Sequence, residues 1–216
     1  MPLVTSDGAP QTPQSTISGI ADSAFAILQD DIDAARKVAD VVIVAMHKGR
    51  VHTPALLEDY EQPLAQAAID AGADAVIAHH AHIAKGIAFH RGRPIFHGLG
   101  NGCVVTRALS SGQDHPARAA WAERRKALFG FEPEPGYDLA PFHPEAKLAI
   151  LGRLSLRKGE PPLASIIPVF VEPPGRPILA SGERTEQIRR YIERITVAAG
   201  LPPIVIDERG RVREAA

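Results

Sequence analysis

The sequence has only one cysteine among its 216 residues, Cys103, so no disulfide can form within the chain. Nothing therefore requires an oxidising compartment. The sequence also lacks an excess of charge, because 24 Lys and Arg residues are balanced by 25 Asp and Glu residues. Without a basic field, neither nucleic acid nor a membrane surface is expected as a partner.

Long apolar runs are missing as well. None approaches the roughly 20 residues that span a bilayer. The N-terminus also lacks the basic segment and following apolar segment of a secretory signal. These absences predict a soluble protein and favour a cytoplasmic location.

What the sequence does contain is an alternation of helical and strand-like patterns. An extended leader is expected over residues 1–20, which are rich in Pro, Ser, Thr and Gly, followed by a single domain over residues 21–216. The predicted elements are, in order, a helix over 21–38, a strand over 41–46, a helix within 56–71, a strand over 75–78, a hairpin of 87–90 and 94–97, a strand over 163–172, a helix over 183–199 and a short strand or hairpin within 204–214. This order predicts parallel neighbouring strands in an α/β sheet. Pro168 predicts an edge strand or a bulge.

Residues 106–150 interrupt this alternation. They carry five of the nineteen prolines and one predicted helix, over 117–129. Long connections of this kind often act as lids. We expect an insertion that forms a mobile cover beside the site and adds no strand to the central sheet.

Histidines gather where two of the predicted strands end. His47 follows the strand over 41–46, and His79, His80 and His82 follow the strand over 75–78. Ligands of open α/β sheets bind beyond the carboxyl ends of the strands, and imidazole is the commonest metal ligand. Strand-terminal histidines can also simply bond backbone groups, but three in four residues opposite a fourth favour a metal site. By contrast, the loop histidines His52, His115 and His143 are predicted to be surface groups.

The stretches ADVVIVAMHKG and IDAGADAVIAHHAHIAKGIAFHRGRPIFHGLGN resemble the CapA-type (poly-γ-glutamate capsule biosynthesis) family of the calcineurin-like metallophosphatase superfamily. That family shows a strand ending in His-aromatic-Gly, a later Gly-His-His-Pro-His and a hairpin ending in Ser-Leu-Gly-Asn. The corresponding residues here are His47-Lys48-Gly49, Ala78-His79-His80-Ala81-His82 and Gly98-Leu99-Gly100-Asn101. Lys48, Ala78, Ala81 and Gly102 depart from the family pattern.

The resemblance implies that His47, His80 and His82 hold one or two divalent transition-metal ions, such as Zn, Mn or Fe. It implies that His79 lies just behind the metal ligands or contacts the substrate, and that Asn101 forms part of the wall of the substrate-binding site. As a histidine that holds no metal, His79 is also predicted to protonate the leaving group. The implied fold is a mixed-sheet sandwich flanked by helices.

The family's early motifs, an Asp/His pair, a Gly-Asp and an Asn-His, have no counterpart before residue 40. The sequence therefore resembles only the C-terminal half of the domain. We expect a self-associating chain or a partner chain that covers an exposed sheet face.

The predicted function is metal-dependent hydrolysis of a phosphoester or of a γ-glutamyl or other amide bond, in an anionic small molecule or polymer. Arg93, with Arg91 and Arg107 nearby, is predicted to contact such a substrate. Cys103, Ser110 and Ser111 have no evident base in the sequence and are interpreted as core or loop residues. The alternative is a non-catalytic fragment or subunit that keeps part of the metal site and acts with a partner chain.

Overall fold

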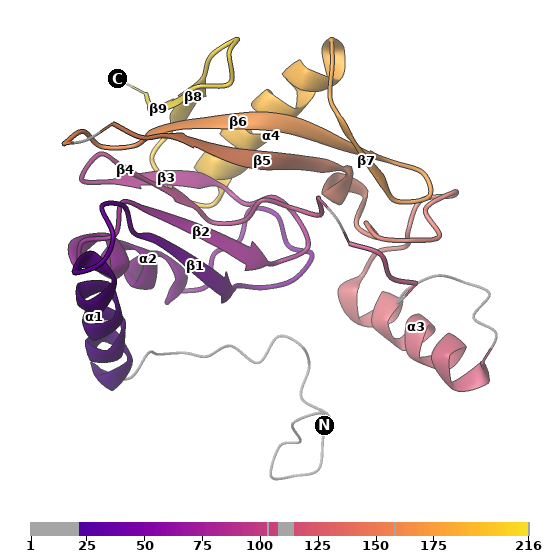
Figure 1. Ribbon diagram of the computed structural model, residues 1–216. Coiled ribbons are helices and arrows are strands. Elements are labelled where there is room, and N and C mark those ends of the chain that lie inside the picture. Colours follow the sequence, from indigo (N-terminus) through magenta and orange to yellow (C-terminus); the bar gives the residue numbers. More distant parts are fainter. Residues whose placement is uncertain (1–21, 103, 108–114, 158, 216) are drawn as a thin grey trace.

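The computed structural model describes residues 22–102, 104–107, 115–157 and 159–215. Its elements are α1 Asp22–Arg36, β1 Ile43–Lys48, α2 Glu61–Asp70, β2 Ala75–His80, β3 Ile87–His90, β4 Arg93–Phe96, α3 Pro116–Phe129, the 3₁₀ helix η1 Pro144–Lys147, β5 Leu148–Ser155, β6 Leu163–Glu172, β7 Arg176–Leu179, α4 Glu183–Ala198, β8 Ile204–Ile206 and β9 Val212–Glu214. Figure 1 shows the sheet of β5, β6 and β7 next to the β3–β4 side of the first sheet, away from α1.

The first sheet has the strand order β1-β2-β4-β3. β1 and β2 are parallel, as the alternation of helices and strands predicted, and their register pairs His47 with His79 and Lys48 with His80. Both strands end two residues later than predicted. His47, His79 and His80 therefore lie within the ends of the strands and not in the loops that follow. β1 is an edge strand within the described part of the chain, so His47 lies at the open side of the sheet.

The hairpin of β3 and β4 is confirmed, with its turn at Arg91 and Gly92. Both residues have positive φ angles, 50° and 72°, which is the backbone of the tight turn that matches the twist of paired strands. Because β4 is also parallel to β2, the turn lies at the end of the sheet where β2 begins.

Two apolar cores stabilise the molecule. The first lies between α1, α2 and the strands β1, β2 and β4, and includes Ile32, Met46 and Ile69. The second joins β3 and β4 to β5, β6, α4 and the β8–β9 hairpin, and includes Phe96, Ile150 and Ile192. Helices α1, α2 and α4 therefore pack through one apolar stripe each, as amphipathic helices do.

The second sheet corrects two predictions. β5 was not predicted, and its first residues, 148–150, belong to a buried strand, so the interruption that was placed over 106–150 ends before Leu148. Pro168 was predicted to mark an edge strand or a bulge, yet β6 lies between β5 and β7, and its register with β5 is continuous through Pro168. The Pro168 carbonyl accepts a hydrogen bond from Ala180 N, so the missing N–H faces the β7 side, just past the end of that strand, and leaves the ladder with β5 intact.

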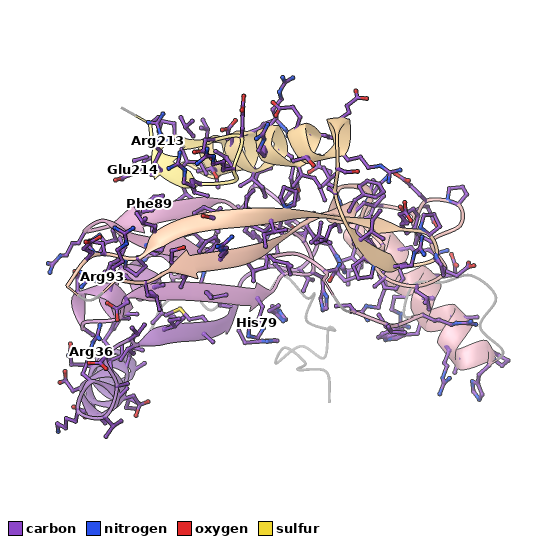
Figure 2. The ribbon with its side chains drawn as sticks, turned by 45° about the horizontal axis from the view of Figure 1, so that its top comes forward. Arg36, His79, Phe89, Arg93, Arg213 and Glu214 are labelled. Atoms are coloured by element: carbon purple, nitrogen blue, oxygen red, sulfur yellow. The ribbon has the colours of Figure 1, made fainter. Side chains whose placement is uncertain are left out.

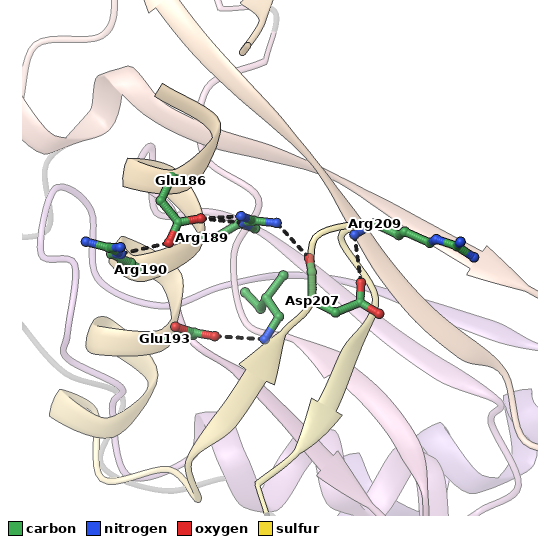
Figure 3. A network of polar contacts seen from close by, with 7 residues as sticks. Glu186, Arg189, Arg190, Glu193, Asp207 and Arg209 are labelled. Carbon is green, nitrogen blue, oxygen red and sulfur yellow. Dashed lines mark hydrogen bonds and ion pairs between the residues drawn. The ribbon is translucent and has the colours of Figure 1, made fainter. Parts of the chain in front are cut away.

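The C-terminal hairpin is attached to α4 by polar contacts, shown in Figure 3. Glu193 accepts a hydrogen bond from Ile206 N at 2.8 Å, and Arg189 donates to the Asp207 carbonyl at 2.9 Å. Glu186 accepts from both Arg189 and Arg190 on the next turn of the helix. These contacts hold the short strands β8 and β9 against the second core.

The mixed α/β class predicted from the sequence is confirmed. The expected leader, residues 1–20, lies outside the described residues. Among the helices described, none is long and apolar enough to cross a membrane.

Candidate functional site

The ends of β1 and β2 bring three imidazole rings together. His47 and His79 lie side by side, with their Nδ1 atoms 3.1 Å apart, so one ring donates a hydrogen bond to the other. The ring centroids of His47 and His80 are 4.4 Å apart. This closeness follows from the parallel register, which places His47 opposite His79 and one residue before the level of His80.

His82 lies beyond His80, with 6.4 Å between their ring centroids, and Asn101 orients it. The Asn101 amide nitrogen donates to the His82 carbonyl at 2.7 Å, so its Oδ1 faces His82 Nδ1 at 3.0 Å. Since Oδ1 can only accept, His82 Nδ1 carries the proton and Nε2 keeps its lone pair. Hydrogen bonds of this kind fix the tautomer of metal-binding histidines.

The backbone of this region is strained. His80, His82 and His52 have φ angles of 99°, 54° and 56°, although residues with a Cβ rarely adopt positive φ. Such conformations cost about 1–3 kcal/mol each and cluster at functional sites. Burial and the neighbouring His47, His82 and His79 rings lower the pKa of His80, which favours the neutral imidazole that a metal requires.

Metal binding by the three predicted ligands, His47, His80 and His82, stays a prediction. Two nitrogens on one tetrahedral zinc ion lie about 3.3 Å apart, given bonds of about 2.0–2.1 Å. The His47–His79 separation of 3.1 Å is close to that value, but the ring centroids of His80 and His82 are 6.4 Å apart. Among the residues that the structure describes, no three His, Cys, Asp or Glu side chains are placed to hold a metal ion.

A buried charged network lies beneath the exposed histidines, and sequence reasoning missed it. Lys48 and Glu61 form an ion pair of 2.7 Å with side chains 3% and 0% exposed. Lys48 also donates to His97 Nδ1 at 3.1 Å, while His97 Nε2 has no partner. Burial, followed by Lys48 and Lys85, lowers the pKa of His97 to about 3. A lysine at the end of a strand is normally expected to be solvated. The one signal that Lys48 is buried was its position in the His-x-Gly motif, where the family usually has an aromatic residue.

The prediction for His52 is wrong. This residue was predicted to be a surface group, but its ring stacks 5.8 Å from His82 and contacts Phe129 at 4.9 Å. Burial, followed by His82, His143 and Arg125, lowers its pKa to about 3. Its Nδ1 is buried without a partner. His143 is half-buried and contacts Phe131, whereas His115 is exposed and caps α3, as a surface group can.

Residues 104–107 and 115–147, the described part of the expected cover, lie beside these histidines. Figure 1 shows α3 on the side toward which β1 and β2 point. Phe129 and Phe131 touch His52, and Ala140 and Phe142 line a cavity that also borders His82. The mobility of this cover and its effect on substrate selection stay predictions.

Arg93 is not part of this arrangement. Because β4 is parallel to β2 and Val76 pairs with Ile95, Arg93 lies level with Asp74, five residues or roughly 16 Å from His79 along the strand direction. Figure 2 shows the two residues at opposite ends of the sheet. Arg93 faces Asp74, and Arg91 pairs with Asp70 at 2.8 Å. The hairpin turn reverses the chain away from the histidines, so neither arginine is positioned to contact a ligand there.

Comparison with known proteins identifies what this chain is similar to. Residues 5–104 match the family model of the bacterial capsule synthesis protein PGA_cap. Over 70 residues the chain is 40% identical to the PGA biosynthesis protein CapA of Bacillus subtilis (strain 168), covering 32% of this chain and 18% of that protein. Over 43 residues it is 54% identical to each of the uncharacterized proteins y4sH and y4uA of Sinorhizobium fredii (strain NBRC 101917 / NGR234), covering 20% of this chain and 9% of each relative.

The resemblance to the CapA-type family is therefore confirmed. The matched stretch contains all three motifs and ends at residue 104, two residues before the insertion expected over 106–150. The match spans less than a fifth of the length of these relatives.

Proposed function

We propose that this chain provides the histidine side of the metal centre of a CapA-type, metallophosphatase-like hydrolase. The observation that carries the proposal is the Asn101–His82 pair, which fixes one tautomer of His82 beside His80 and His47. In a capsule-type enzyme the substrate would be a phosphoester or a γ-glutamyl or other amide. The Bacillus subtilis relative is a PGA biosynthesis protein, which supports an anionic substrate.

Each residue has a separate role in this proposal. His47, His80 and His82 supply neutral nitrogen donors, and Asn101 orients one of them. Divalent metal ions supply hydroxide near neutral pH and polarise the bond to be cleaved. His79, which shares a proton with His47 through their Nδ1 contact, is the group that would protonate the leaving group.

A second candidate function is a non-catalytic subunit that acts with another chain. The lack of a three-donor set within the described residues favours it, because a two-metal centre needs a bridging carboxylate and further ligands. The open edge of β1, where His47 lies, is the side from which such donors could approach.

The experiment is hydrolysis by the purified chain of bis-p-nitrophenyl phosphate and of a γ-glutamyl anilide, with manganese or zinc titrated in. Turnover that requires metal and is lost in His80→Ala supports the enzyme. His90→Ala is the matched control, because His90 pairs with Asp70 at the other end of the sheet and its loss leaves turnover unchanged. Metal binding without turnover supports the subunit; turnover that survives metal removal or persists in His80→Ala contradicts the proposal.

A further inference from the structure

A cavity of about 200 Å³ lies between the histidines and the cover segment. His52, His82 and Asn101 form one wall, and Arg125, Ala140 and Phe142 form the other. Pockets that enclose a drug-sized ligand measure roughly 300–1,000 Å³, so this cavity suits one small group at the end of a larger molecule.

Arg125 gives this cavity its charge. Its guanidinium lies 4.2 Å from the ring centroid of Trp121 and 5.3 Å from that of Phe129, on the same face of α3. These aromatic contacts hold the side chain in place, and no acidic side chain that the structure describes pairs with Arg125, whose pKa is lowered by burial alone. On the same helix, Glu123 pairs with Lys126, which also pairs with Glu132.

The opposite wall offers a second polar atom without a partner. The Nδ1 atom of His52 is buried and unbonded, and buried polar atoms are nearly always hydrogen-bonded in folded proteins. His52 is held in position by its own backbone, which donates to the Ala81 carbonyl at 2.8 Å. Among the described residues, a guanidinium without an acidic partner and a ring nitrogen without a hydrogen bond therefore line one small cavity.

We propose that this cavity is an anion subsite, in which Arg125 binds a carboxylate or phosphate group of the substrate next to His82. The planar guanidinium donates two parallel hydrogen bonds to either anion. Ala140 and Phe142 exclude water and strengthen that attraction. The inference rests on the proposed function, because it names the part of the substrate that the histidines would receive. It also gives the cover segment a role in selecting substrates.

Anion binding is measured directly, without added metal, by titrating inorganic phosphate in one arm and glutarate in the other while the ring signals of His52 are followed by NMR. Hydrogen bonds to charged groups contribute about 1.5–3 kcal/mol, so Arg125→Met weakens binding roughly 10- to 100-fold. Methionine keeps the apolar contact with Trp121 and Phe129, and circular dichroism verifies that α3 remains. Arg125→Lys recovers part of the affinity, because it keeps the charge but not the fork.

Arg124→Ala is the matched control, since Arg124 is the exposed neighbour on the same helix, and it leaves binding unchanged. Stronger binding in one arm identifies the anion as phosphate or carboxylate. Absence of saturable binding in both arms, equal loss in Arg124→Ala, or full binding by Arg125→Met overturns the subsite. Because no metal is added, such a failure leaves metal-dependent turnover, and with it the proposed function, to be judged separately.

Discussion

Replacement of Lys48 by Met is expected to destabilise the protein more than any surface change. Lys48 and Glu61 are 2.7 Å apart and almost fully buried. Removing one partner of a buried ion pair leaves an uncompensated charge and costs about 3–5 kcal/mol. The same loss is expected for Glu61→Gln. The double variant is expected to lose far less than the sum, because neither member of the Lys48–Glu61 pair is left without the other.

Urea unfolding of the four proteins of this cycle gives the coupling free energy directly. Arg50→Met serves as the control, because Arg50 pairs with Glu58 at 2.6 Å in the same loop but is 25% exposed. An accessible pair of this kind contributes about 1 kcal/mol or less. Additive losses in the double variant, or a Lys48→Met cost as small as that of Arg50→Met, would refute the reasoning.

Three further predictions concern neighbours of this network. Burial lowers the pKa of Lys85 from 10.5 to about 8. Between these two pH values unfolding takes up a proton, so the free energy of unfolding increases by about 3 kcal/mol as the pH rises. Urea titrations at pH 7 and pH 11 measure this increase, and Lys85→Met is expected to abolish it. Gly49→Ala is expected to cost about 1–3 kcal/mol, seen as a lower melting temperature, because Gly49 has a φ of 96° and a Cβ would lie 2.8 Å from Glu61 Oε2. Asn101→Leu frees the His82 ring, so zinc affinity, measured by competition with a chromophoric chelator, falls roughly 10- to 100-fold; unchanged affinity would contradict that role.

How much of this could be predicted depends on the range of the interactions involved. The parallel pairing of β1 with β2 follows from two apolar runs separated by a helix, which are local patterns. β5 was missed because it begins directly after a Pro-rich stretch with three buried residues and no alternation, and because Gly152 lies within it. Arg93 was misplaced because closeness in sequence to the histidines ignores the direction in which the hairpin turns.

The residues of the candidate site likewise differ in whether local sequence patterns could reveal them. His47, His80 and Asn101 could be selected from motifs, since each follows or ends a strand. Lys48 and Glu61 are thirteen residues apart, and their pairing depends on how α2 packs beneath β1. His52 lies in the loop after β1 and Arg125 lies on α3, so only the folded chain brings them to one cavity.

Metal binding by His47, His80 and His82 is the property on which the proposed function depends most. Equilibrium dialysis of the purified chain against zinc or manganese, followed by metal analysis, measures it directly. The expected result is stoichiometric metal on the unaltered protein and on His90→Ala, and its loss in His80→Ala and His82→Ala variants that remain folded. A chain that retains no metal, or one that binds it equally well without His80 and His82, would contradict the assignment.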